Sequence, residues 1–121
     1  MNRLAAAVSL FVFAGAFPPA TSAFADDFAY GPDTCRTGYV WREAQPFDHV
    51  CVRPSSRTTA ARENAVALSR IDPGGAYGPF TCITGFVWRE AFPGDAVCVT
   101  PSRRSIVAQE NAEAPLHRTR G

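Results

Sequence analysis

The tripeptide Trp-Arg-Glu occurs twice in the chain, as Trp41-Arg42-Glu43 and as Trp88-Arg89-Glu90. Alternation along a strand would place the tryptophan and the glutamate on one face and the arginine on the other. An indole is a stacking platform and a carboxylate is an acceptor, so this face suits a sugar or a partner peptide. The favoured alternative is that each tryptophan is the main apolar residue of a very small core, while the glutamate and the arginine pair with the backbone or with neighbouring residues. The six residues are our first candidates for ligand contact.

Two carboxylates flank a turn in each half of the chain: Glu43 with Asp48, and Glu90 with Asp95. A glycoside hydrolase needs two carboxyl groups at a defined separation, one of them with a raised pKa. A turn on so small a chain offers no deep cleft in which a carboxyl group would be desolvated. We therefore expect the aspartates to cap the turns through hydrogen bonds to the backbone, and an envelope-glycan hydrolase is a minor alternative.

The four cysteines fall into two pairs that have the same spacing, Cys35 with Cys51 and Cys82 with Cys98. An even number of cysteines in a small exported chain predicts disulfides. Duplication favours pairing within each half, because an ancestral single unit could only pair within itself. Each bridge would stabilise the fold by roughly 3 kcal/mol. A four-thiolate zinc site is the alternative, but the chain has no C-x-x-C motif, and we predict neither a metal nor a cofactor.

Residues 30–67 and 77–114 align without a gap, and most aligned positions are identical. The chain is therefore a tandem duplication. The shared residues are mostly of types that pack, turn or cross-link, whereas we expect the positions that differ to be exposed. The predicted organisation is a signal peptide over 1–25, a first unit over 26–72, a second unit over 73–116 and a flexible tail over 117–121.

Residues 1–25 have the features of a secretory signal peptide, with Arg3, an apolar run over 4–17 and small residues at Ala23 and Ala25. The run is shorter than the roughly 20 residues that span a bilayer. We predict cleavage after Ala25, a secreted product and no stable membrane span.

The charge of the chain is nearly balanced, because 12 arginines face 11 acidic residues and lysine is absent. Cleavage would remove Arg3 and none of the acids, so the mature chain would carry no formal net charge. This balance argues against a nucleic-acid binder. The lack of lysine excludes Schiff-base and Walker-type lysine chemistry.

Each unit is predicted to be a small α+β fold, a disulfide-stapled β-hairpin followed by a helix (ββα), duplicated in tandem. Aromatic and β-branched residues favour strands, and proline with aspartate favours a turn. In the first unit we expect a strand over 38–44, a turn over 45–48, a return strand over 49–53 and a helix over 58–70. Type I is the turn geometry that both units can share, because Phe47 disfavours the positive φ that Gly94 would permit. Small residues four apart on the two helices should form stripes that pack on the hairpins: Ala61 with Ala65, and Ala108 with Ala112.

The second unit has apolar residues at three positions where the first unit is polar: Phe80, Ile83 and Phe92 replace Asp33, Arg36 and Gln45. If these three side chains are exposed, they form an apolar patch that indicates a partner surface. The alternative, equally favoured, is that they pack against the first unit.

The string G-[YF]-V-W-R-E-A…P-x-D-x-V-C-V-x-P, followed by a helix with alanine and asparagine, resembles a repeat module of exported bacterial proteins of actinobacterial type. The resemblance covers 30–67 and 77–114. Arg53 departs from the commoner V-C-V-T-P, and Ala96 departs from D-H-V-C. The resemblance implies export and repetition, and it supplies no mechanism.

Together these patterns predict a secreted binding or cell-envelope interaction module without catalytic activity. Its predicted partner is a cell-wall glycan or a secreted protein, with no nucleic acid. The main alternative is a small inhibitor of an extracellular enzyme that presents the turn over 92–95 as a rigid loop. The candidate contact residues are Trp41, Arg42, Glu43, Trp88, Arg89, Glu90, Phe80 and Phe92.

Overall fold

The computed structural model describes residues 28–119, and the predicted signal peptide lies outside them. Each unit contains a short antiparallel hairpin and one α-helix. In chain order the elements are η2 (Gly31–Asp33), β1 (Val40–Trp41), β2 (Cys51–Val52), α3 (Pro54–Ala65), η3 (Ala67–Arg70), β3 (Val87–Trp88), β4 (Cys98–Val99), α4 (Pro101–Glu113) and η4 (Ala114–His117), where η is a 3-10 helix.

The two disulfides pair as predicted, Cys35 with Cys51 and Cys82 with Cys98, each across 16 residues. The hairpins also have equivalent registers, because Trp41 lies opposite Cys51 and Trp88 lies opposite Cys98. The prediction of two disulfide-stapled ββα units is therefore confirmed. No helix within residues 28–119 is long and apolar enough to cross a membrane.

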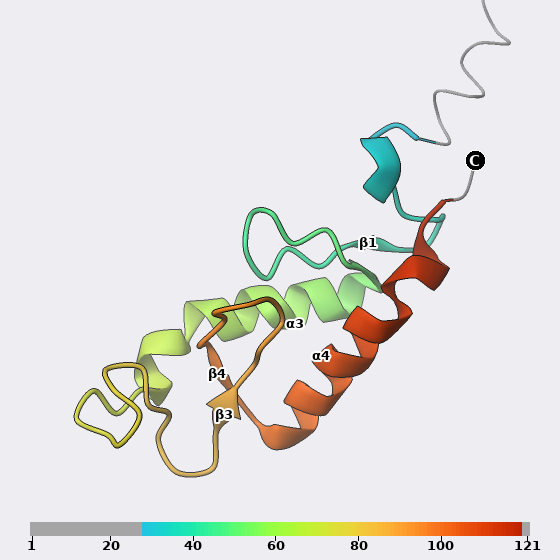
Figure 1. Cartoon of the computed structure of the whole chain (residues 1–121). Coiled ribbons are helices and arrows are strands. Elements are labelled where there is room, and N and C mark those ends of the chain that lie inside the picture. The colour runs from blue at the N-terminus through green and yellow to red at the C-terminus, as the bar shows by residue number, and fades with distance from the viewer. Residues whose placement is uncertain (1–27, 120–121) are drawn as a thin grey trace, which may run out of the picture.

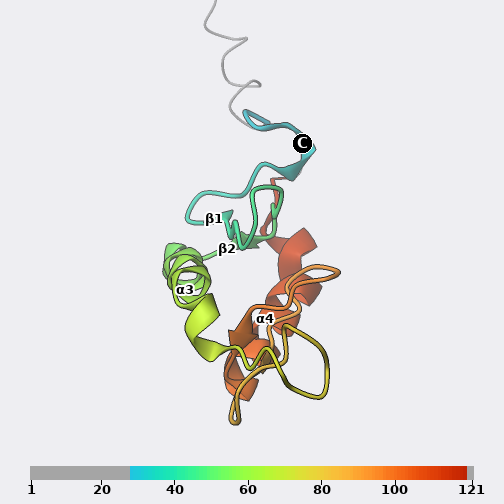
Figure 2. The ribbon, with the colours of Figure 1, turned by 90° about the vertical axis from the view of Figure 1, so that its left-hand side faces the viewer.

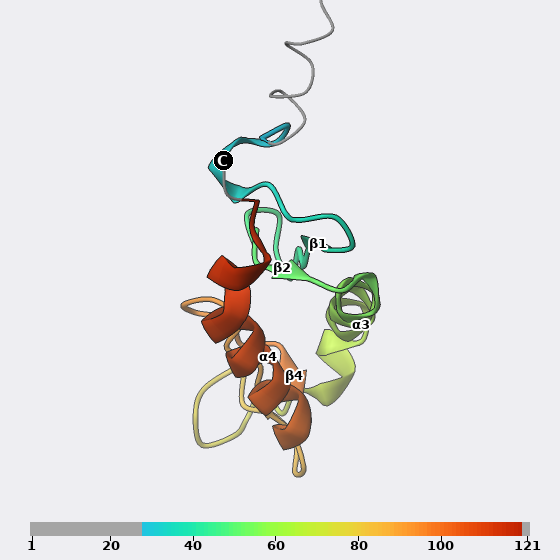
Figure 3. The same ribbon diagram turned by 90° about the vertical axis from the view of Figure 1, so that its right-hand side faces the viewer.

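The two units are interlocked rather than placed one after the other. Helices α3 and α4 run in opposite directions, with one hairpin near each end of the molecule (Figure 1). Views from the two sides show the helices on opposite sides with the strands between them (Figures 2 and 3). Each hairpin can therefore contact both helices.

The segment after each helix pairs with the N-terminal loop of the other unit. Ile71, which follows α3, forms an isolated bridge with Cys82, and Arg118, which follows α4, forms the equivalent bridge with Cys35. The two units therefore exchange these segments reciprocally, each completing the other. This exchange also holds His117 in place, because the His117 carbonyl accepts a hydrogen bond of 2.8 Å from the Arg36 amide. The described part of the predicted tail, residues 117–119, is thus hydrogen-bonded to the first unit.

The core is small and built mainly of alanine and valine: Ala44, Ala60, Ala91 and Val107, with Phe92 packed against them. The tryptophans are half-buried and lie outside this cluster. The interpretation of tryptophan as the main core residue is therefore wrong. So little buried apolar area explains why this fold also relies on disulfides and buried polar networks.

Helix α3 begins four residues earlier than expected, because Pro54 occupies the first helical position instead of only ending the strand. A proline there loses no hydrogen bond, since the first amides of a helix have no partner within it. The predicted stripe is also wrong, because Ala61, Ala65, Ala108 and Ala112 are all exposed. The buried helical positions are instead Ala60 and Glu63 on α3 and Val107 on α4.

The two hairpin turns differ in geometry. In the second unit Gly94 has φ of 88°, so the turn after Pro93 is of type II character. In the first unit Phe47 stands at the equivalent position and does not adopt a positive φ. The expectation of one shared type I turn is therefore wrong, since glycine allowed the second turn to change its form.

Candidate functional site

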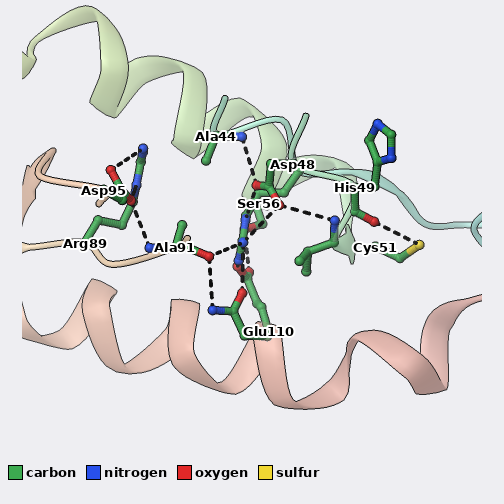
Figure 4. A network of polar contacts seen from close by, with 12 residues as sticks. Ala44, Asp48, His49, Cys51, Ser56, Arg89, Ala91, Asp95 and Glu110 are labelled. Atoms are coloured by element: carbon green, nitrogen blue, oxygen red, sulfur yellow. Dashed lines mark hydrogen bonds and ion pairs between the residues drawn. The ribbon is translucent and has the colours of Figure 1, made fainter. Parts of the chain in front are cut away.

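Arg42 lies at the centre of a buried network that joins the two units. Its guanidinium forms an ion pair of 2.7 Å with Asp48 of its own hairpin and one of 3.2 Å with Glu110 on α4. The same group donates to the Asn111 side chain at 2.9 Å and to the Ala91 carbonyl at 3.3 Å. Figure 4 shows Asp48, Ala91 and Glu110 converging on this point.

Arg89 forms the equivalent network in the second unit. It pairs with Asp95 at 2.8 Å and with Glu63 on α3 at 3.2 Å, and it donates to the Asn64 side chain at 3.0 Å. Arg42 and Arg89 are 0% and 1% exposed. Each arginine therefore bonds its own hairpin to the helix of the other unit.

These positions correct the prediction that Arg42 and Arg89 contact a ligand, because neither side chain reaches the surface. The aspartates have the predicted capping role as well as an ion-pair role. Asp48 accepts hydrogen bonds from the Ala44 amide at 3.0 Å and the Val50 amide at 3.3 Å. Asp95 does the same in the second unit for Ala91 and Val97. Loss of either aspartate would leave a buried guanidinium and two backbone amides without that partner, which would lower the free energy of unfolding.

A surface groove of about 310 Å³ lies on the outer side of the first hairpin. We call it the first groove; its lining residues are Tyr30, Thr34, Cys35, Tyr39, Val40, Trp41, Glu43 and Arg57. The edge of Tyr30 meets Trp41 with 5.7 Å between ring centroids. The indole N–H donates to the Asp33 carbonyl at 2.8 Å, which fixes the ring while part of it remains accessible.

An equivalent groove of about 240 Å³ lies on the second hairpin. We call it the second groove; it is lined by Tyr77, Thr81, Cys82, Phe86, Val87 and Trp88. Tyr77 and Trp88 repeat the edge-to-face contact at 6.5 Å, and the Trp88 N–H donates to the Phe80 carbonyl at 2.8 Å. The duplication thus produces two aromatic grooves with the same backbone framework.

The grooves differ in charge because several charged residues beside the first are replaced together. Beside the first groove, His49 stacks on Trp41 at 3.7 Å and its Nδ1 lies 3.2 Å from an Asp33 oxygen. An oxygen of Asp33 also lies 3.9 Å from Arg118. At the positions 47 residues away from Asp33, His49 and Arg118, the chain has Phe80, Ala96 and Ile71. The second groove is therefore the more apolar of the two.

Glu43 and Glu90 occupy corresponding positions in the two hairpins, and each adopts an unusual backbone conformation. Their φ values are 54° and 56°, in the left-handed region that non-glycine residues avoid. Glu43 pairs with Arg57 at 2.6 Å, and Glu90 pairs with Arg104 at the same distance. Because Asp48 is also held by a guanidinium, the carboxylate pairs resemble structural ion pairs more than a catalytic acid and nucleophile.

The proposed apolar patch of the second unit is only partly exposed. Phe80 is 55% exposed and Ile83 is 39% exposed, whereas Phe92 packs against the core cluster. Phe92 is therefore removed from the surface candidates. The exposed rings of Tyr30 and Tyr77 were not among the predicted contact residues, although their recurrence in a Tyr-Gly-Pro motif was a signal.

Comparison of the chain with protein-family models, with curated proteins and with solved structures finds no match. The resemblance to actinobacterial repeat modules therefore stays a prediction. What is established is a pair of similar ββα units, each with its own disulfide.

Proposed function

We propose that the protein is a secreted, non-catalytic binding module that holds a cell-wall glycan in its two aromatic grooves. The observation that carries this proposal is the recurrence of the Tyr–Trp pair, with its anchored indole, at equivalent residues of both units. Rigid aromatic side chains bring large contact area at low entropic cost. Two disulfides support export, because disulfides persist in oxidising compartments.

A repetitive polymer suits this arrangement because it can occupy both grooves at once. The second contact then forms at a high effective concentration, so weak individual grooves give a higher overall affinity. Beside the first groove the Glu43–Arg57 pair also supplies an acceptor and donors for hydroxyl groups. Neither groove is deep, which is consistent with binding an extended chain rather than enclosing a small molecule.

The test uses the mature oxidised protein, an N-acetylglucosamine tetramer and purified peptidoglycan as probes. Tyr30→Ala and Tyr77→Ala remove exposed rings, 72% and 78% accessible, and leave both tryptophans in place. We expect each change to weaken binding of the tetramer by about tenfold or less, as judged by tryptophan emission. The double variant should lose retention on peptidoglycan, because both contacts are gone.

The matched control is Phe47→Ala, which removes a ring of 83% exposure that lines neither groove. This variant should bind both probes like the parent protein. An unchanged emission spectrum with the tetramer, together with no retention on peptidoglycan, would refute glycan binding. Equal losses in the control would mean that the grooves are not the site.

A second candidate function, inhibition of an extracellular enzyme, is supported by the first turn instead of the second. Phe47 protrudes from a turn whose Asp48 is held by the buried Arg42. Such a preorganised aromatic residue could enter the pocket of a partner enzyme. The predicted loop over 92–95 is less suitable, because Phe92 packs inward. Inhibition of a secreted protease that is abolished by Phe47→Ala, with glycan binding absent, would favour this candidate.

A further inference from the structure

We propose that the outer end of the second unit docks on an anionic lipid surface. The surface in question consists of Tyr77, Phe80 and Ile83, with Arg62 and Arg70 beside it; we call it the apolar tip. This proposal goes beyond glycan binding, since it depends on Phe80 and Ile83, which the first unit does not share.

The three apolar side chains follow one another along a short looped segment. The Thr81 amide donates to the Gly78 carbonyl at 3.1 Å, and the Phe86 amide donates to the Ile83 carbonyl at 3.2 Å. These turns belong to the loops at the far end of the molecule from η2 and η4 (Figure 1). A projecting loop with tyrosine, phenylalanine and isoleucine suits the boundary between headgroups and acyl chains.

The equivalent segment of the first unit shows that these apolar residues are not needed for the fold. At the positions of Phe80 and Ile83 the first unit has Asp33 and Arg36, and its backbone forms the same bridge at Cys35. The apolar character therefore calls for an explanation outside folding, and an exposed apolar cluster marks an interaction surface.

Positive charge beside the apolar tip indicates that the partner surface is anionic. The Ile83 amide donates to the Arg70 carbonyl at 2.9 Å, and the Arg70 guanidinium lies 4.5 Å from the centre of the Phe86 ring. Arg70 and Arg62 line one hollow, and no ion pair joins either of them to a carboxylate within residues 28–119.

The neighbouring acids offset this charge only in part. Glu63 is already shared by Arg89 and Arg103. Asp72 is exposed and keeps its negative charge, so the two arginines exceed it by one positive charge. A second copy docking tip to tip would bring like charges together, whereas lipid phosphates would be attracted to both arginines. Charge therefore favours an anionic bilayer over self-association.

The experiment is flotation of the mature protein with vesicles of phosphatidylcholine, alone or mixed with phosphatidylglycerol. The variant Phe80→Asp/Ile83→Arg installs the residues that the first unit tolerates, so it should fold, as circular dichroism will show. We expect the parent protein to float with the mixed vesicles and this variant to lose at least tenfold in partitioning. Arg62→Gln/Arg70→Gln should reduce binding to the mixed vesicles more than binding to phosphatidylcholine alone.

The matched control is Leu116→Ser, which removes an exposed apolar side chain and introduces the residue found at the equivalent Ser69. It should float like the parent. Absence of the parent from the vesicle fraction would overturn the proposal, and so would unchanged flotation of Phe80→Asp/Ile83→Arg. Concentration-dependent dimerisation that the same variant abolishes would assign the tip to a second copy instead. Retention on peptidoglycan is measured separately, so failure here leaves the glycan proposal standing.

Discussion

The two units have nearly the same interior but different outer surfaces. Inside, each has a buried arginine held by an aspartate of its own hairpin and a glutamate of the other unit's helix. Outside, the Asp33–His49 pair beside the first groove is replaced by Phe80 and Ala96 beside the second. The reciprocal interior therefore constrains both units equally, whereas the residues beside the grooves were free to differ in charge.

The largest expected effect comes from breaking the shared interior. Arg42→Met and Arg89→Met each leave two carboxylates without their buried guanidinium, and we expect a loss of about 3–5 kcal/mol in the free energy of unfolding. The two losses should differ slightly. Glu63 would keep Arg103 at 2.8 Å, whereas the same guanidinium lies 3.7 Å from Glu110, so Arg42→Met should cost more. Urea unfolding measures both values.

The same variants test whether the halves fold as one. Each network joins both units, so hydrogen exchange should show lost protection in both hairpins whichever arginine is replaced. Loss confined to the mutated half would contradict this. The control is Arg57→Met, whose partner Glu43 is partly exposed, and it should change stability by about 1 kcal/mol or less.

The sequence was sufficient to predict the elements within each unit but not the exchange between units. Cysteine spacing and the duplication predicted the pairs Cys35–Cys51 and Cys82–Cys98, and turn chemistry predicted the capping role of Asp48. Arg42 was named as a candidate contact residue, but the structure agrees with the favoured alternative, in which the arginine pairs with neighbouring residues and the backbone. A signal was nevertheless present, since the arginine, aspartate, glutamate and asparagine of each network are identical in both units.

The groove residues were only partly predicted, because the grooves also depend on contacts between residues that are distant in the sequence. Trp41 was recognised as a candidate, but a single strand pattern cannot show that a tyrosine eleven residues earlier returns to meet it. The helix face was mispredicted because Asn64 turns toward the hairpin, where its side chain donates to the Ala44 carbonyl at 3.0 Å. This contact leaves Ala61 and Ala65 facing solvent. Tertiary hydrogen bonds thus outweighed the small-residue pattern.

The disulfides should contribute similarly in both units, since each closes the same separation of 16 residues. Cys35→Ser/Cys51→Ser and Cys82→Ser/Cys98→Ser should each lower the free energy of unfolding by about 3 kcal/mol. Thermal and urea unfolding of the two double variants give the comparison. A much larger loss for one pair would show that the units do not share stability evenly, and no loss for either would contradict the role of the bridges as staples.

The smallest expected effect distinguishes the two turns, where a single glycine changes the form of the backbone. Gly94→Phe puts a side chain at φ of 88° and should cost about 1–2 kcal/mol. The reverse exchange, Phe47→Gly, introduces no such strain, and its cost should stay below about 1 kcal/mol, mainly from added freedom in the unfolded chain. Equal costs measured by urea unfolding would mean that the second turn can revert to the form of the first. Unequal costs in the expected order would show that a single glycine is enough to separate two otherwise equivalent hairpins.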